Sequence, residues 1–116
     1  MTTQLQTAQI GTISEQVKYV AEAEGIDAGF IRDEIAAGRL VIPANKQHLK
    51  TNLKPVGIGR PLSTKVNANI GASSIRSTVE DELEKMRVAL DAGADAIMDL
   101  STGGNLDNTR ERLLAE

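Results

Sequence analysis

The spacing of apolar residues in the first third of the chain predicts two short amphipathic helices. Ser14 and Asp27 each stand where a helix N-cap is expected, and Gly25 and Gly38 each stand where a helix is expected to end. The apolar stripes are Val17, Val20 and Ala21 in the first helix, and Phe30, Ile31 and Ile35 in the second.

Residues 43–63 are predicted to be irregular. Pro43, Pro55 and Pro61 interrupt this stretch, and two glycines lie between the last two prolines. We therefore expect a domain boundary here. Residues 1–63 are predicted to form a helical lead-in with an irregular linker, and residues 64–116 are predicted to form a separate unit.

After residue 64 the pattern becomes one of strand, helix, strand and helix. Positions 65–70 alternate between polar and apolar residues, which indicates a strand, and positions 95–100 are a second strand candidate. Thr78 and Asp81 resemble the capping box of a helix between the strands, and Asp107 is predicted to cap a last helix. In the helix between the strands, the predicted apolar face consists of Val79, Leu83, Met86 and Leu90. The predicted solvated face of the same helix includes Glu80, Asp81, Glu82 and Glu84.

This βαβα order predicts an α/β fold with parallel strands, because the connection between the strands is long enough for a right-handed crossover. Two parallel strands alone do not make a stable sheet. We therefore expect one of two arrangements. Either the lead-in helices and a partner chain complete the layer, or these residues are a piece of a larger protein. We expect the isolated chain to expose apolar sheet edges, and so to aggregate or stay partly molten.

The composition excludes several classes of function. The formal net charge is −3 and aromatic residues make up 2% of the chain, so the basic and aromatic surfaces of nucleic-acid-binding proteins are not expected. Neither a run of about 18 apolar residues nor a secretory signal pattern is present. We expect a cytoplasmic protein that binds neither nucleic acid nor membranes. The absence of cysteine excludes disulfides, thiolate nucleophiles and cysteine-ligated metals within these residues.

Polar residues at the carboxyl ends of the two predicted strands are the candidates for chemistry, because ligands bind there in α/β proteins. Asn67 and Asn69 place two carboxamides on one strand face, where they suit a polar heterocycle or a ribose. The alternative is a solvated strand face. Asp99 lies close to Ser101 and is either an acid/base group or a simple loop cap, and Met98 on pattern alone is most often a core residue.

Four stretches resemble the phosphomethylpyrimidine synthase family, the thiamine pyrimidine synthases. They are residues 30–34, 42–45, 65–71 and 98–103, and the resemblance covers nearly the whole chain. Its most specific parts are the NANIG and MDLSTG segments in this order and spacing. The resemblance implies a helical N-terminal segment followed by a (β/α)8 barrel. This chain would hold only the first βαβα units, since such a barrel needs roughly 250 residues.

The resemblance also implies a reaction. In this radical S-adenosylmethionine family a [4Fe–4S] cluster cleaves S-adenosylmethionine, and the radical rearranges 5-aminoimidazole ribotide into 4-amino-5-hydroxymethyl-2-methylpyrimidine phosphate. The family's substrate contacts fall on Asn69 and Met98 of this sequence. Asn67, Asp99 and Ser101 are expected beside them from their positions. Zinc is a further family cofactor, and the intact enzyme is expected to be a homodimer.

The family's three-cysteine cluster motif, zinc-binding histidines and remaining substrate residues have no counterparts here, so the chain alone is expected to be inactive. No catalytic residue and no metal ligand is assigned within it. Two alternatives stay open. The paralogous 5-hydroxybenzimidazole synthase of anaerobic cobamide biosynthesis uses the same ribotide, and gene neighbours would distinguish it. The other alternative is a non-catalytic nucleotide-binding or assembly module, which tight binding of the ribotide by this chain alone would favour.

Overall fold

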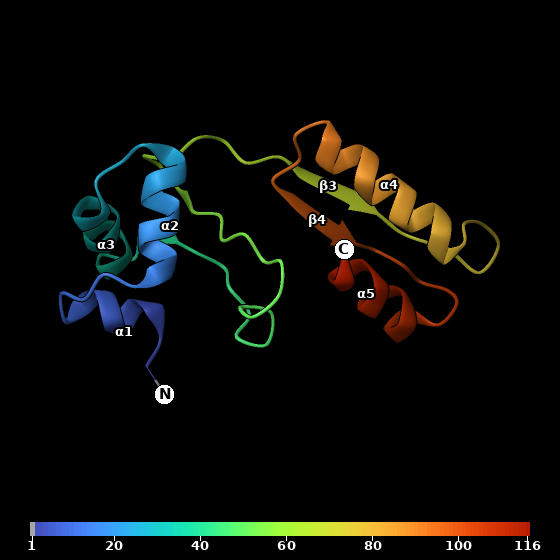
Figure 1. Cartoon of the computed structure of the whole chain (residues 1–116), viewed down its shortest axis with the longest axis horizontal. Coiled ribbons are helices and arrows are strands. Elements are labelled where there is room, and N and C mark those ends of the chain that lie inside the picture. The colour runs from blue at the N-terminus through green and yellow to red at the C-terminus, as the bar shows by residue number, and fades with distance from the viewer. Residues whose placement is uncertain (1) are drawn as a thin grey trace. The chain divides into compact units, whose positions relative to one another are not determined.

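The computed structural model describes residues 2–116, which form two compact units (Figure 1). The first unit ends at Thr64, and the second is Lys65–Glu116. None of the helices in the described residues combines the length and the apolarity needed to cross a membrane.

The first unit is built on α1 (Gln4–Gln9), α2 (Glu15–Glu24) and α3 (Ala28–Ala36). The predicted N-caps are confirmed, because the side chains of Ser14 and Asp27 accept hydrogen bonds from backbone amides in the first turns of α2 and α3. The core of this unit is aliphatic and consists of Ala8, Val17, Val20, Ala21, Ile31, Ile35, Leu40 and Ile42.

A short antiparallel pair adds to these helices. β1 (Leu40–Val41) pairs with β2 (Ile58–Gly59), with Leu40 opposite Gly59. The prediction that residues 43–63 are wholly irregular is therefore wrong at β2. A Cβ atom on Gly59 would lie 2.8 Å from Cγ of Leu40, so glycine allows the two backbones to approach around this buried leucine.

The second unit consists of β3 (Asn67–Ile70), α4 (Val79–Asp91), β4 (Ala96–Asp99) and α5 (Leu106–Ala115). The two strands pair in parallel over their whole length, as predicted. Both are shorter than predicted, since β3 begins at Asn67 and β4 ends at Asp99. At their amino ends, the side chain of Asp95 accepts a hydrogen bond from the backbone N–H of Val66 (2.7 Å). These observations establish a mixed α/β structure.

One face of the β3–β4 sheet packs against α4. Ile70, Leu83 and Met86 form the buried centre, and Val79, Ile97 and Leu113 pack around it. Leu90 was predicted to join this face but is 48% exposed. A 13-residue helix rises roughly 20 Å, whereas a four-residue strand rises roughly 13 Å, so the last turn of α4 extends beyond the strand that it covers.

Two further predictions about charged residues in this unit are wrong. Asn105, not Asp107, is the N-cap of α5, since its side chain accepts from the N–H of Asn108 (3.1 Å). Asp107 lies instead in the first turn, where its charge complements the helix dipole. Glu82 is not part of a solvated face, because it is 0% exposed.

Candidate functional site

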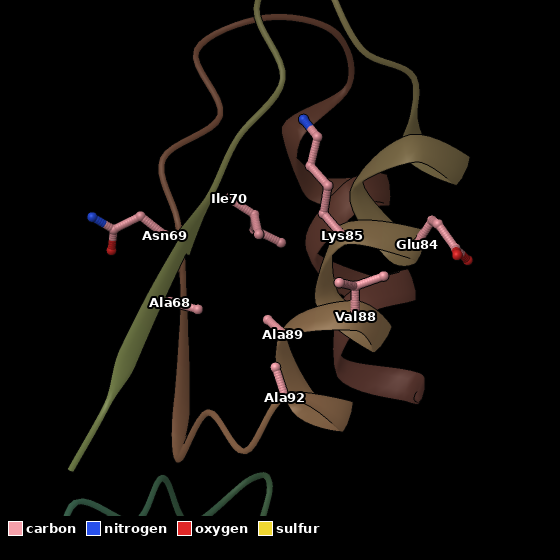
Figure 2. A pocket seen from close by; sticks show the side chains of 8 residues that line it. All are labelled: Ala68, Asn69, Ile70, Glu84, Lys85, Val88, Ala89 and Ala92. Carbon is pink, nitrogen blue, oxygen red and sulfur yellow. The ribbon is translucent and has the colours of Figure 1, made fainter.

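The side chains of Asn69 and Met98 lie on the same face of the β3–β4 sheet. The two residues are partners in the parallel register, and partners across a sheet project to the same side. Figure 2 shows Asn69 pointing away from α4, whereas Ala68 and Ile70 point toward it. Met98 is 48% exposed, so this face presents an amide and a thioether on adjacent strands.

Asn67 shares this face with Asn69 and is bonded to it. Its Nδ2 donates to Oδ1 of Asn69 at 2.9 Å. The bond occupies the carbonyl oxygen of Asn69 and fixes the plane of its carboxamide. The Nδ2 group of Asn69 is then oriented as a donor for an acceptor atom on a ligand.

Asp99 and Ser101, by contrast, do not lie on the amide face. Asp99 pairs with Ile70, which points toward α4. Its carboxylate accepts from the backbone N–H of Ser101 at 2.9 Å, from the Ser101 hydroxyl, and from Nε of Arg110 at 3.1 Å. Burial raises the pKa of Asp99, but the bonds from Ser101 and Arg110 outweigh it and hold the pKa below its ordinary value. The geometry is that of the loop cap considered as the alternative from sequence.

Hydrogen bonds join the loops that follow β3 and β4. The N–H of Ala72 donates to Oγ of the buried Ser101 at 3.0 Å, and the N–H of Thr102 donates to the carbonyl of Ala72 at 2.8 Å. Gly71 lies against the backbone of Leu100, where a Cβ atom would be 2.9 Å from the carbonyl carbon. The two strand ends are thus held at a fixed separation. Ser101 contributes to this by binding the backbone amide of Ala72.

Sequence reasoning missed Glu82 as a residue of this region. Its buried carboxylate accepts a hydrogen bond from the N–H of Gly71 at 2.7 Å, directly beyond the end of β3. The helical spacing could have revealed it, because position 82 is three residues after Val79 and four residues before Met86 and so borders the apolar face.

A groove of about 340 Å³ lies on the opposite side of β3, between the strand and α4 (Figure 2). Ala68, Ile70, Val88, Ala89 and Ala92 provide most of its lining. This lining is suited to packing against another apolar element, and it supplies little polar chemistry.

No group of three or more histidine, cysteine, aspartate or glutamate residues that could hold a metal ion occurs among residues 2–116, and the whole sequence lacks cysteine. The residues present do not fit an iron–sulfur cluster or a zinc ion.

A parallel strand pair, with helix cover on one face and amides on the other, makes this unit a βαβα segment of an α/β protein, a class in which ligands commonly bind at the carboxyl ends of the strands. Comparison with known proteins gives the family. The model of the radical SAM ThiC family matches residues 3–116. The chain belongs to this family, and the resemblance stated from its motifs is confirmed.

Curated relatives agree closely in sequence. The phosphomethylpyrimidine synthase of Desulforamulus reducens is 54% identical over 114 residues, which is 98% of this chain and 26% of the relative. That of Thermus thermophilus is 54% identical over 112 residues (97% of this chain, 26% of the relative), and that of Haloarcula marismortui is 52% identical over 108 residues (93% and 22%). The chain therefore spans about a quarter of the length of the relatives that it matches.

Proposed function

We propose that this chain supplies part of the substrate site of a phosphomethylpyrimidine synthase in thiamine biosynthesis. The reaction is the radical rearrangement of 5-aminoimidazole ribotide to 4-amino-5-hydroxymethyl-2-methylpyrimidine phosphate. The observation that carries the proposal is the register of β3 and β4, which puts Asn69 and Met98 side by side on the face away from α4. Membership of the radical SAM ThiC family and the names of the relatives support it.

Each residue of the proposed site has a distinct role, on the amide face or in the loops beside it. Asn69 donates a hydrogen bond from Nδ2 to the ribotide, and Met98 packs its thioether against it. Asn67 orients the carboxamide of Asn69 through the 2.9 Å bond between them. Asp99 and Ser101 keep the two strand ends at their separation through the bond to Ala72. These residues bind and orient the substrate, and none of them is assigned a proton transfer.

The cofactors come from outside these residues. The family implies S-adenosylmethionine, which supplies the radical, and an iron–sulfur cluster. Since residues 2–116 hold no group of metal ligands, the cluster and the zinc ion that the resemblance implies depend on other parts of a longer protein.

We propose that, in that protein, the first two units of a (β/α)8 barrel are formed by β3, α4, β4 and α5. The helices α1–α3 belong to a helical segment before the barrel. The parallel pairing, with a helix on one face and polar residues on the other, supports this placement, because the interior face of such a barrel carries the substrate residues at its strand ends. We further propose a cytoplasmic homodimer.

A chimeric enzyme tests the proposal directly. In it, this chain replaces the 114 matched residues of the Desulforamulus reducens relative, and its residues keep the numbers used here. We expect the chimera to restore growth of a strain that lacks its own phosphomethylpyrimidine synthase when no thiamine is supplied, and to convert the ribotide in vitro.

The site residues are then tested in the chimera. Asn69→Ala should lower kcat/KM by about 5- to 150-fold, the effect of losing one hydrogen bond worth about 1–3 kcal/mol to a desolvated ligand. Asn108→Ala, at an exposed asparagine on α5, is the matched control and should change kcat/KM less than twofold. An active chimera in which Asn69→Ala behaves like Asn108→Ala would refute the proposed site.

A further inference from the structure

The carboxylate of Glu82 is buried beside the end of β3. Glu82 lies in the first turn of α4 and is 0% exposed, the same as Ile31 in the core of the first unit. A buried carboxylate is costly unless each oxygen is bonded, so its retention here needs a reason.

Both oxygens of Glu82 have partners. Oε2 accepts from the backbone N–H of Gly71 at 2.7 Å, while Oε1 accepts from the Ser77 hydroxyl and from Nζ of Lys85 at 2.7 Å. Burial raises the pKa of Glu82, but the bonds from Lys85, Ser77 and Gly71 outweigh it and leave the pKa below its ordinary value. At neutral pH the group is therefore an ionised acceptor.

These bonds hold both ends of the loop that leaves β3. Gly71 is the first residue after the strand and lies two residues beyond Asn69. Ser77 comes just before the N-cap of α4 and, among the described residues, is the non-glycine residue with a positive φ, 79°. A side chain in that backbone region is strained and persists where surrounding contacts hold it. Glu82 supplies such a contact at one end of the loop and fixes the exit of the strand at the other.

We propose that Glu82 is a positioning residue for the substrate site: by binding the Gly71 amide and the Ser77 hydroxyl together, its carboxylate sets the direction in which β3 ends and hence the placement of Asn69. This inference rests on the proposed function, since it takes Asn69 as a substrate contact. A carboxylate suits the task because it can accept from the strand end and from the loop end at once.

The test compares Glu82→Gln with Glu84→Gln in the chimeric enzyme. Glu84 lies on the same helix with 71% of its side chain exposed, so its change controls for the loss of one negative charge. We expect Glu82→Gln to raise KM for the ribotide about tenfold, the effect of a sub-ångström misplacement of a binding group. Glu84→Gln should leave KM within twofold. A residue that only stabilised the fold would lower the amount of active enzyme, and hence the apparent kcat, at unchanged KM.

A second variant covers the case in which Glu82→Gln does not fold. Ser77→Gly removes one of the three partners, keeps the charge of Glu82 and places glycine at a φ that it readily adopts. We expect it to raise KM two- to fivefold. If KM is unchanged in whichever of Glu82→Gln and Ser77→Gly fold, the proposal is overturned.

Hydrogen–deuterium exchange separates this proposal from the proposed function. In the chimera without substrate, Glu82→Gln should speed exchange of the peptide covering residues 67–74, and Glu84→Gln should not. If the chimera is inactive but this difference is present, the proposed function fails while the positioning of the strand end by Glu82 stands. If the chimera is active but Glu82→Gln matches Glu84→Gln in both exchange and KM, the proposed role of Glu82 is wrong and the proposed function stands.

Discussion

Replacing Gly71 by alanine is expected to force the ends of β3 and β4 apart. The added Cβ would lie 2.9 Å from the carbonyl carbon of Leu100 and 3.0 Å from the amide nitrogen of Ser101. Both are backbone atoms, so no change of rotamer relieves the collision. Since carbon atoms in contact lie about 3.5–4.0 Å apart, one strand end has to move by about 0.6 Å or more.

The cost follows from this displacement. Overpacking of this kind destabilises a fold by about 1–3 kcal/mol. Asn69 and Met98 each lie two residues before the colliding groups, so the shift changes their separation directly. A misplacement of about 1 Å can lower catalysis about 100-fold, and about 0.6 Å is therefore expected to lower kcat/KM about tenfold.

The assay is the steady-state conversion of the ribotide by the chimeric enzyme, with Gly93→Ala as the control. Gly93 has φ +93° and no heavy atom within 4 Å of an added Cβ, so alanine there strains the backbone without pushing the strand ends apart. We expect Gly93→Ala to cost about 1 kcal/mol of stability and to leave kcat/KM within twofold. If Gly71→Ala retains the kcat/KM of its parent, the fixed separation of the two strand ends is not what the site requires.

Three further results are expected. The isolated 116-residue chain should melt without a cooperative transition, since the core of its second unit contains three buried residues, and a sharp two-state melt of a monomer, followed by circular dichroism, would contradict this. Thr78→Ala removes the capping box of α4 and should therefore lower the stability of the chimera by about 1 kcal/mol. The apparent melting temperature measures this loss, and Thr51→Ala in a loop is the control. The pKa of Asp99 is below its ordinary value of about 3.9, so the stabilisation from Arg110, at most about 1 kcal/mol because the Arg110 side chain is half exposed, should be complete near pH 6 and be lost progressively as the pH falls below about 4. An equal effect of Arg110→Ala on the melting temperature at pH 6 and at pH 3 would contradict this.

Local features of the chain could be predicted from sequence because their causes are local. Ser14, Asp27 and Thr78 cap helices through bonds to residues three positions ahead, and this spacing is visible in the sequence. The alternation around Asn69 reflects a strand with one buried face, and chain connectivity then requires parallel pairing with β4. The strand and its parallel pairing could thus be predicted, whereas the direct pairing of Asn69 with Met98 depends on the register of the two strands.

Features that depend on distant neighbours could not be predicted. The pairing of Leu40 with Gly59 joins residues that no periodicity links. By its spacing Glu82 borders the apolar face of α4, but the amide and hydroxyl donors that bind its carboxylate come from a loop that folds back onto α4, and no periodicity indicates them. The shared face of Asp99 and Ile70, which separates Asp99 from the amides, becomes clear only once the register of the strands is known.

The contact between the loops after β3 and β4 also constrains how this protein can evolve. Ala72 bonds to both Ser101 and Thr102, and a Cβ on Gly103 would collide with the backbone of Ser74. A change of length or of side-chain size in one loop therefore requires a compensating change in the other. Across homologous sequences, we expect substitutions at positions 71–74 to covary with substitutions at positions 100–103.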